Sequence, residues 1–429
     1  MGHHHDNHYR NAAFICLLLF ATHIVWPRAG FTDDPISIHG YYKTFFVVFD
    51  LPQLIAPFPL PAQPLRGAVD NRFRFKLGYA PTPWLASDVA YDFSPQVRDP
   101  LLFTEQIIFI GINPTRYRAI DFNSRLYPAV GDSIGSFGIF HNLDRAVVTL
   151  KTSPVDILIG RQVVAWGSAR VLNPTDVIAP FTFEELDKEE RFGVDAVRLR
   201  MPLGALTEID AGYIFGKDFR FEESAFFVRH KFYTAKTDIA LLLLGFRNHL
   251  LVGFDLARAL GGAGLWFEAA QVLTQVFNEH PTGEKKHYFR GTAGFDYSFS
   301  GKTYGFIEYH YNGAGANQPQ HYWANLSTPA YLDGAVYLFG KHYVVPGLVY
   351  QLSPLVTFSS QALWNLSDWS LNWALRVEYN LAQNIHLAAG TLMGFGKNPE
   401  IAISPLGLRF HSEFGAYPDI YFSSFRIYF

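Results

Sequence analysis

Apolar and polar residues alternate along many stretches of this chain. In residues 71–79 one face is apolar and the other basic, with Phe73, Phe75, Leu77 and Tyr79 opposite Arg72, Arg74 and Lys76. The same period of two recurs in residues 288–299 and 371–381. A period of two predicts β-strands whose two faces meet different surroundings. Because so many long strands carry an aromatic face, we expect lipid rather than a small protein core to cover that face.

Short breaks between the alternating runs give the number of strands. Eight such breaks begin at Pro81, Ser153, Pro202, Thr234, Gly261, Ser300, Ser353 and Ala382. Bacterial outer-membrane barrels have an even number of antiparallel strands, short periplasmic turns and longer outer loops. With both termini in the periplasm, eight short turns predict an all-β transmembrane barrel of about 18 strands. Residues 116–127 also alternate, so counts of 16 and 20 fit the pattern as well.

The stretches between these strands are predicted to be outer loops. The long ones span about residues 51–69, 94–142, 167–191, 312–341 and 397–418.

Composition agrees with a lipid-facing barrel. Only 17% of the residues are charged and 17% are aromatic, whereas a soluble domain carries about 25% charged residues. No segment in the body of the chain has about 20 consecutive apolar residues, which excludes helical membrane spans. The net charge of −3 gives no reason to expect a nucleic-acid partner. The single cysteine, Cys16, leaves no pair for a disulfide.

The two ends of the chain indicate export and assembly. Residues 1–30 resemble a signal peptide, with Arg10 before the apolar stretch 12–26, and residues 31–429 are predicted to form the barrel. The last strand ends on Phe429, with Ile427 and Phe425 on the same face. This end resembles the signal that the barrel-assembly machinery reads. We therefore expect the bacterial outer membrane as the location, and its lipid, lipopolysaccharide and assembly machinery as partners.

The inward faces of the strands are predicted to carry the charges. The expected pore-lining residues are Lys43, Arg72, Arg74, Lys76, Arg198, Arg200, Glu208, Asp210, Arg290, Arg376, Glu378 and Arg426. The last strand of a closed barrel pairs with the first, so Arg426, Lys43 and the row Arg72, Arg74, Lys76 should lie on three adjacent strands. We call these five residues the basic ladder. It is expected either to select anions or to form interior salt bridges; for Arg198, Arg200, Glu208 and Asp210 a stiffening network across one tight hairpin is favoured.

One stretch carries a family resemblance. A strand reaches Trp166 and Gly167, and a loop follows with Asn173, Pro174 and Asp176. This block resembles one in uncharacterised porin-like barrels of Gram-negative bacteria and is loosely similar to alginate-export porins, whose barrels have 18 strands. The resemblance implies a passive channel and names no substrate. Trp166 is expected at the membrane rim, and the loop either constricts the lumen or packs outside it.

No catalytic constellation is recognisable. His411, Ser412 and Glu413 have suitable side chains, but neighbours on a strand point to opposite faces. Glu308 and His310 share a face, and with Tyr304 they form at most a polar lumen cluster. No metal-ligand spacing or cofactor motif is present, so we expect neither a metal nor a cofactor.

The expected function is passive diffusion of small solutes, with a preference for anions. The alternatives are a transporter of hydrophobic compounds, a barrel enzyme and a scaffold. The transporter is suggested by the run Leu241 to Leu244, which makes both faces of one strand apolar.

Overall fold

A computed structural model describes residues 35–58, 65–103, 117–121, 124–278, 287–333, 336–403 and 406–429. Pro35–Tyr428 form one compact unit. The signal peptide predicted for residues 1–30 lies outside the described residues.

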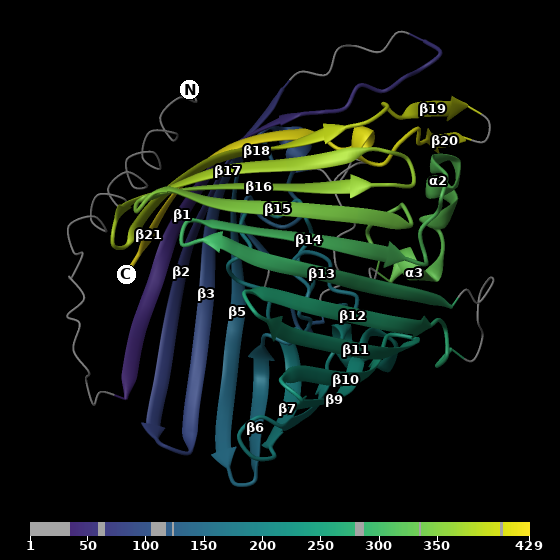
Figure 1. The fold of residues 1–429 in the computed structure, drawn as a ribbon. Helices are drawn as coiled ribbons and strands as arrows, with labels where there is room; N and C mark the ends of the chain where they lie inside the picture. The colour runs from purple at the N-terminus through teal and green to yellow at the C-terminus, as the bar shows by residue number, and fades with distance from the viewer. Residues whose placement is uncertain are drawn as a thin grey trace, which may run out of the picture. The chain divides into compact units, whose positions relative to one another are not determined.

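The compact unit is a closed antiparallel barrel of 18 strands, joined mostly in chain order (Figure 1). The wall consists of β1 (Ile36–Asp50), β2 (Arg66–Thr82), β3 (Leu85–Arg98), β5 (Phe137–Thr152), β6 (Val155–Gln162), β7 (Val194–Pro202), β8 (Glu208–Ile214), β9 (Ala225–Thr234), β10 (Thr237–Phe246), β11 (His249–Leu260), β12 (Ala263–Leu273), β13 (Tyr288–Ser300), β14 (Thr303–Asn312), β15 (His342–Ser353), β16 (Val356–Asn365), β17 (Leu371–Ala382), β18 (Ile385–Phe395) and β21 (Asp419–Tyr428). The barrel closes where β21 pairs with both β18 and β1. All eight short turns and the strand number predicted from the sequence are confirmed.

Small elements lie in the long connections. β4 (Ser124–Tyr127) adds to β5, and β19 (Glu400–Ile403) pairs with β20 (Leu406–Arg409) in a separate hairpin. The segment 116–127, which alternates in the sequence, thus contributes only this short added strand within its described part. Two short helices, α2 (Tyr322–Asn325) and α3 (Pro329–Leu332), lie between β14 and β15, and 3-10 turns occur at Pro100–Leu102, Lys217–Phe219, Phe221–Glu223, Pro319–His321 and Phe414–Ala416. In the described part of the chain no helix is long and apolar enough to cross a membrane.

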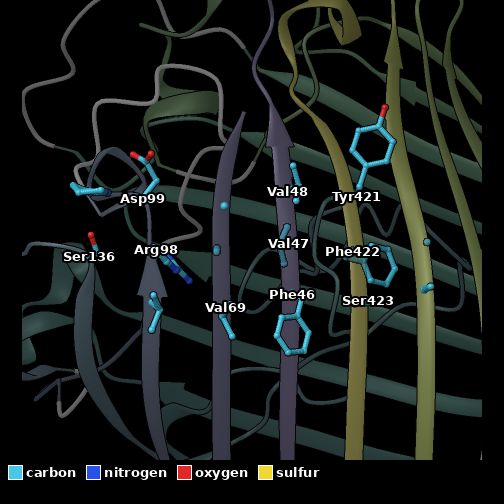
Figure 2. Close-up of a pocket in the computed structure, with 16 residues that line it drawn as sticks. Phe46, Val47, Val48, Val69, Arg98, Asp99, Ser136, Tyr421, Phe422 and Ser423 are labelled. Atoms are coloured by element: carbon cyan, nitrogen blue, oxygen red, sulfur yellow. The ribbon is translucent and has the colours of Figure 1, made fainter. Parts of the chain in front are cut away.

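The outer face of the barrel is apolar, as the alternation predicts. Phe75, Leu77 and Tyr79 on β2 are exposed, whereas Arg74, directly before Phe75, is buried inside. A shallow groove on this face, lined by Phe46, Val48, Val69 and Tyr421 among others, runs over β1, β2 and β21 (Figure 2). Lipid is the solvent that such a face requires.

Several strands extend further than the sequence pattern indicates. β2 already begins at Arg66 and β3 continues to Arg98, so the outer loops there are shorter than expected. Arg98 Nε donates to Asp70 at 2.7 Å, and Arg66 Nη1 donates to Asp99 at 2.9 Å. Because these ion pairs satisfy the charges at the strand ends, the pairing of the strands continues through polar residues, beyond the point where the alternation of apolar residues stops.

Candidate functional site

The interior is dominated by the connection between β6 and β7. This segment, residues 163–193, is called the crossing loop here, because it contacts opposite parts of the inner wall. Its first half bonds to β11, β12, β13 and β14, and its second half bonds to β1, β2 and β21. Of the two arrangements left open by the sequence, the structure thus shows the one in which the loop enters the lumen.

Two buried carboxylates hold the first half in place. Glu308 on β14 accepts hydrogen bonds from the backbone N–H groups of Arg170 at 2.8 Å and Leu172 at 2.9 Å, and from the indole of Trp266 at 3.1 Å. Glu268 on β12 accepts from both the backbone N–H and the hydroxyl of Thr175, at 2.8 and 2.6 Å. Both carboxylates are fully buried. Their role in the structure is therefore to bind the loop.

An apolar cluster supports the same half. Val164, Trp166 and Ile178 of the loop pack in one buried cluster with Leu242 and Leu244 of β10. The expectation that Trp166 sits at the membrane rim is wrong: it is 7% exposed and lies edge-on to Phe227 inside the barrel. The backbone turns inward after Gln162, earlier than the predicted strand end at Gly167, and carries the indole with it. The apolar inner face of β10, which suggested a hydrophobic-compound transporter, is covered by the loop.

The motif residues shape this fold-back. Gly167 has φ +112°, and a Cβ there would lie 2.2 Å from Asn173 Oδ1. Pro174 and Asp176 are buried. Asp176 is bound by Arg191, which also donates to the backbone oxygen of Ala179 at 2.6 Å. Burial raises the pKa of Asp176 to about 6, although the Arg191 guanidinium favours the charged form. This pair joins the two halves of the loop.

The second half carries five carboxylates. Three of them, Asp187, Glu189 and Glu190, meet the basic ladder, and we call these three the acidic strap. Asp187 accepts from Lys43 at 3.0 Å and from Arg72 at 3.4 Å. Glu189 also accepts from Lys43, and from the hydroxyl of Tyr428 at 2.5 Å. Glu190 pairs with Lys76. The Lys43 ammonium holds the pKa of Asp187 below its usual value, with Arg72 adding to the effect. The strap thus faces the basic ladder.

Strand register brings the residues of the basic ladder onto three adjacent strands. Lys43 on β1 is directly opposite Arg72 on β2 and Arg426 on β21. Within the ladder, exposure differs sharply: Lys43 and Arg74 are buried, whereas the side chains of Arg72 and Lys76 are 36% and 39% exposed.

A β-bulge adds two charges that the sequence pattern missed. The register of β3 with β5 shifts between Ala90 and Tyr91, so that Asp144 on β5 has no partner residue on β3. Asp144 and Arg145 then both point inward and pair with each other. Asp144 also binds Arg74, which pairs with Asp92 at 3.3 Å and with Glu190 at 3.6 Å as well. A strict period of two cannot put neighbours on one face, so alternation gives no signal for this pair.

The other predicted lumen residues form local ion pairs. In the hairpin of β7 and β8, Arg198 Nε donates to Asp210 at 2.8 Å, and Arg200 pairs with Glu208 at 2.6 Å. On the opposite wall Glu378 accepts from Arg376 at 2.8 Å and from Arg426 at 2.7 Å. Arg290 is buried on the inner face of β13.

Neither group considered for catalysis in the sequence forms a cluster of its own. The first group is His411, Ser412 and Glu413, and the second is Glu308, His310 and Tyr304. His411 lies beyond β20, not on a strand as expected, and contacts Glu400 at 3.1 Å. Glu413 accepts from the Tyr343 hydroxyl on β15 at 2.5 Å and from the Asn365 amide on β16 at 2.7 Å, which ties the connection between β20 and β21 to the ends of two strands. Tyr304 donates to Asp296, and His310 meets Thr292, so Glu308 shares a cluster with neither.

A closed barrel of 18 strands with an apolar exterior and a charged interior defines a class by its fold: the chain folds as a porin-like transmembrane β-barrel. No family model and no curated protein sequence matches it.

Solved structures with the same fold are channels named Occ and OprD. OccAB2 of Acinetobacter baumannii is 8% identical, with a TM-score of 0.57 over 94% of this chain and 99% of that one. OccK9 of Pseudomonas aeruginosa is 12% identical, with a TM-score of 0.56 over 92% and 98%. The outer membrane protein OprD of Pseudomonas aeruginosa is 8% identical, with a TM-score of 0.51 over 92% and 94%. At such identities the likeness shows the fold alone, and the loose similarity to alginate-export porins is not supported.

Proposed function

We propose that this protein is a passive diffusion channel for small solutes and that its lumen favours anions. The crossing loop narrows the path, and solutes move past its charged half along the basic ladder. Outer-membrane lipid surrounds the barrel, and the C-terminal strand directs its assembly.

The observation that carries the preference for anions is the exposure of the ion-paired side chains in the described lumen. Six cations keep about a third or more of their side chains exposed, namely Arg72, Lys76, Arg170, Arg200, Lys231 and Arg376. Three carboxylates do so, namely Asp121, Glu189 and Asp238. Buried pairs neutralise themselves, so the exposed side chains decide which ions a passing solute meets. A cation in contact with an anion in water attracts it by about 1 kcal/mol, roughly fivefold in local concentration.

Single-channel recording in planar bilayers under a salt gradient tests this function. The wild-type barrel should give steady conductance and a reversal potential on the anion side. The variant Arg72→Gln/Lys76→Gln removes two exposed cations and should move the reversal potential toward cations. Arg74 is left intact, because its removal would strand the buried carboxylates Asp92 and Asp144.

The matched control is Lys217→Gln/Arg220→Gln, which removes the same charge from an exposed outer connection. A folded wild-type barrel without conductance would refute the channel. An equal reversal potential in the ladder variant and in wild type would refute the preference for anions.

A further inference from the structure

We propose that the acidic strap is a tethered competitor: it occupies the basic ladder in place of a solute, and the channel selects solutes with several carboxylates, which displace it. This inference rests on the proposed channel function and names the class of solute that the same site takes.

The crossing loop has two halves that are held differently. In the first half Leu172, Thr175 and Ile178 are almost completely buried, and Glu268 and Glu308 bind the backbone. In the strap the side chains of Asp187, Glu189 and Glu190 are 16%, 42% and 22% exposed. The strap contacts the wall through charged side chains and the Tyr428 hydroxyl. The pairs with Arg72 and Lys76 are more than a third exposed on the cation side and contribute little net free energy. Lys43 is buried, so the strap leaves only when another carboxylate takes its place on this ammonium, while Phe183 and the first half stay docked.

The charge balance at the ladder depends on the strap. Five cations of β1, β2 and β5 meet there, namely Lys43, Arg72, Arg74, Lys76 and Arg145. Two further cations have carboxylates outside this group: Arg426 pairs with Glu378, and Arg118, which also reaches Asp144, pairs with Asp121. Five carboxylates face them, namely Asp92, Asp144, Asp187, Glu189 and Glu190, and the strap supplies three of the five. Without the strap the group keeps two carboxylates against five cations. A site with three uncompensated cations attracts an anion of matching charge.

The strap also defines the shape of its replacement. Three carboxylates on four consecutive residues, Asp187 to Glu190, reach cations on β1 and β2. A short acidic peptide or another flexible oligocarboxylate presents the same groups at similar spacing. A single carboxylate can replace only one of the three strap carboxylates, and the other two stay in place.

The test compares wild type with Asp187→Asn/Glu189→Gln/Glu190→Gln, using triglutamate as the probe and glutamate and trialanine for comparison. Current interruptions in single-channel records give the apparent dissociation constant of each probe. A short tether supplies an effective concentration in the millimolar range. Removing the tethered carboxylates should therefore lower the dissociation constant of triglutamate about tenfold. The dissociation constant of glutamate, which has two carboxylates against four in triglutamate, should fall by a smaller factor. Trialanine, which has a single carboxylate, should not interrupt the current of either protein.

Two further variants keep the test interpretable. Glu189→Gln/Glu190→Gln retains Asp187 beside the buried Lys43, so it serves if the triple variant does not fold; it should show a smaller change in the same direction. Asp132→Asn/Asp218→Asn/Glu222→Gln removes three carboxylates from exposed outer connections and should leave triglutamate affinity at the wild-type value.

The outcomes separate the two proposals. An anion-selective channel whose triglutamate affinity is unchanged or weakened by strap neutralisation would overturn the tethered competitor and leave the channel function standing. If wild type does not conduct, the channel function fails, and calorimetric titration of detergent-solubilised barrels with triglutamate still decides the inference. There, tighter binding to the strap variant supports the competitor, and equal or weaker binding overturns it.

Discussion

The carboxylate of Glu308 offers the sharpest test of how the crossing loop is held. Three donors, two from the loop backbone and one from Trp266, converge on this single buried group. The replacement Glu308→Ala leaves all three without their acceptor. Hydrogen bonds to a charged group contribute about 1.5–3 kcal/mol each. Because the three share one carboxylate and are not additive, we take the lower end, about 4–5 kcal/mol.

This loss should open the loop without unfolding the barrel. The wall keeps its complete strand pairing around β14, so the barrel itself should stay folded. Leu172 and Ile178 still favour docking of the loop by about 1.5–3 kcal/mol each through apolar burial, so the loop should undock more often rather than remain open. A loss of 4–5 kcal/mol raises the population of the undocked loop about 1000-fold. We therefore expect larger and noisier single-channel currents from a barrel of normal heat stability.

Limited trypsin digestion gives an independent readout. The loop contains the cleavage sites Arg170, Lys188 and Arg191. In Glu308→Ala these sites should be cut much faster than in wild type, as mass spectrometry of the fragments will show. The control Glu208→Ala removes a lumen carboxylate that pairs with Arg200 and should leave the loop resistant. Wild-type digestion rates and current noise in Glu308→Ala would refute the anchoring role of this carboxylate.

Two further predictions concern the same loop. The pKa of Asp176 is raised from 3.8 to about 6 in the docked loop, so the docked loop binds a proton more tightly than the open loop does. Docking should therefore be strongest below about pH 4, weaken as the pH rises to about 6, and stay constant above that. Asp176→Asn should remove this component, which is measured as the difference in current noise between variant and wild type from pH 4 to pH 7; parallel profiles would contradict the assignment. Gly167→Ala places a Cβ against Asn173 at φ +112°, which should cost about 1–3 kcal/mol of docking and speed tryptic cleavage, whereas Gly131→Ala, also at positive φ but in open space, should not.

Several features of the site were within reach of sequence reasoning. The register of β21, β1 and β2 follows from closure and parity, so the alternation alone is enough to assign the ladder residues to neighbouring strands. The hairpin pairs Arg198 with Asp210 and Arg200 with Glu208 are equally local, because one tight turn fixes which side chains meet.

The ion-pair partners of the basic ladder could not be derived from the sequence. Asp187 lies 144 positions from Lys43 in the chain, and Arg170 lies 138 positions from Glu308. Loop conformation has no periodicity from which such contacts can be derived. The bulge at Asp144 defeats the alternation itself, since it turns two neighbouring residues to the same face.

The sequence by itself therefore predicted a barrel of about 18 strands, its short turns and the face that side chains in regular strands take, because each of these depends on residues two positions apart or on one short turn. Only the tertiary structure decided that residues 163–193 enter the lumen, that Glu268 and Glu308 are anchors, and that the acidic strap meets the basic ladder. The physical reason is that burial inside a closed barrel brings together groups from strands on opposite walls. Their charges and hydrogen bonds are satisfied by partners that no local pattern in the chain records.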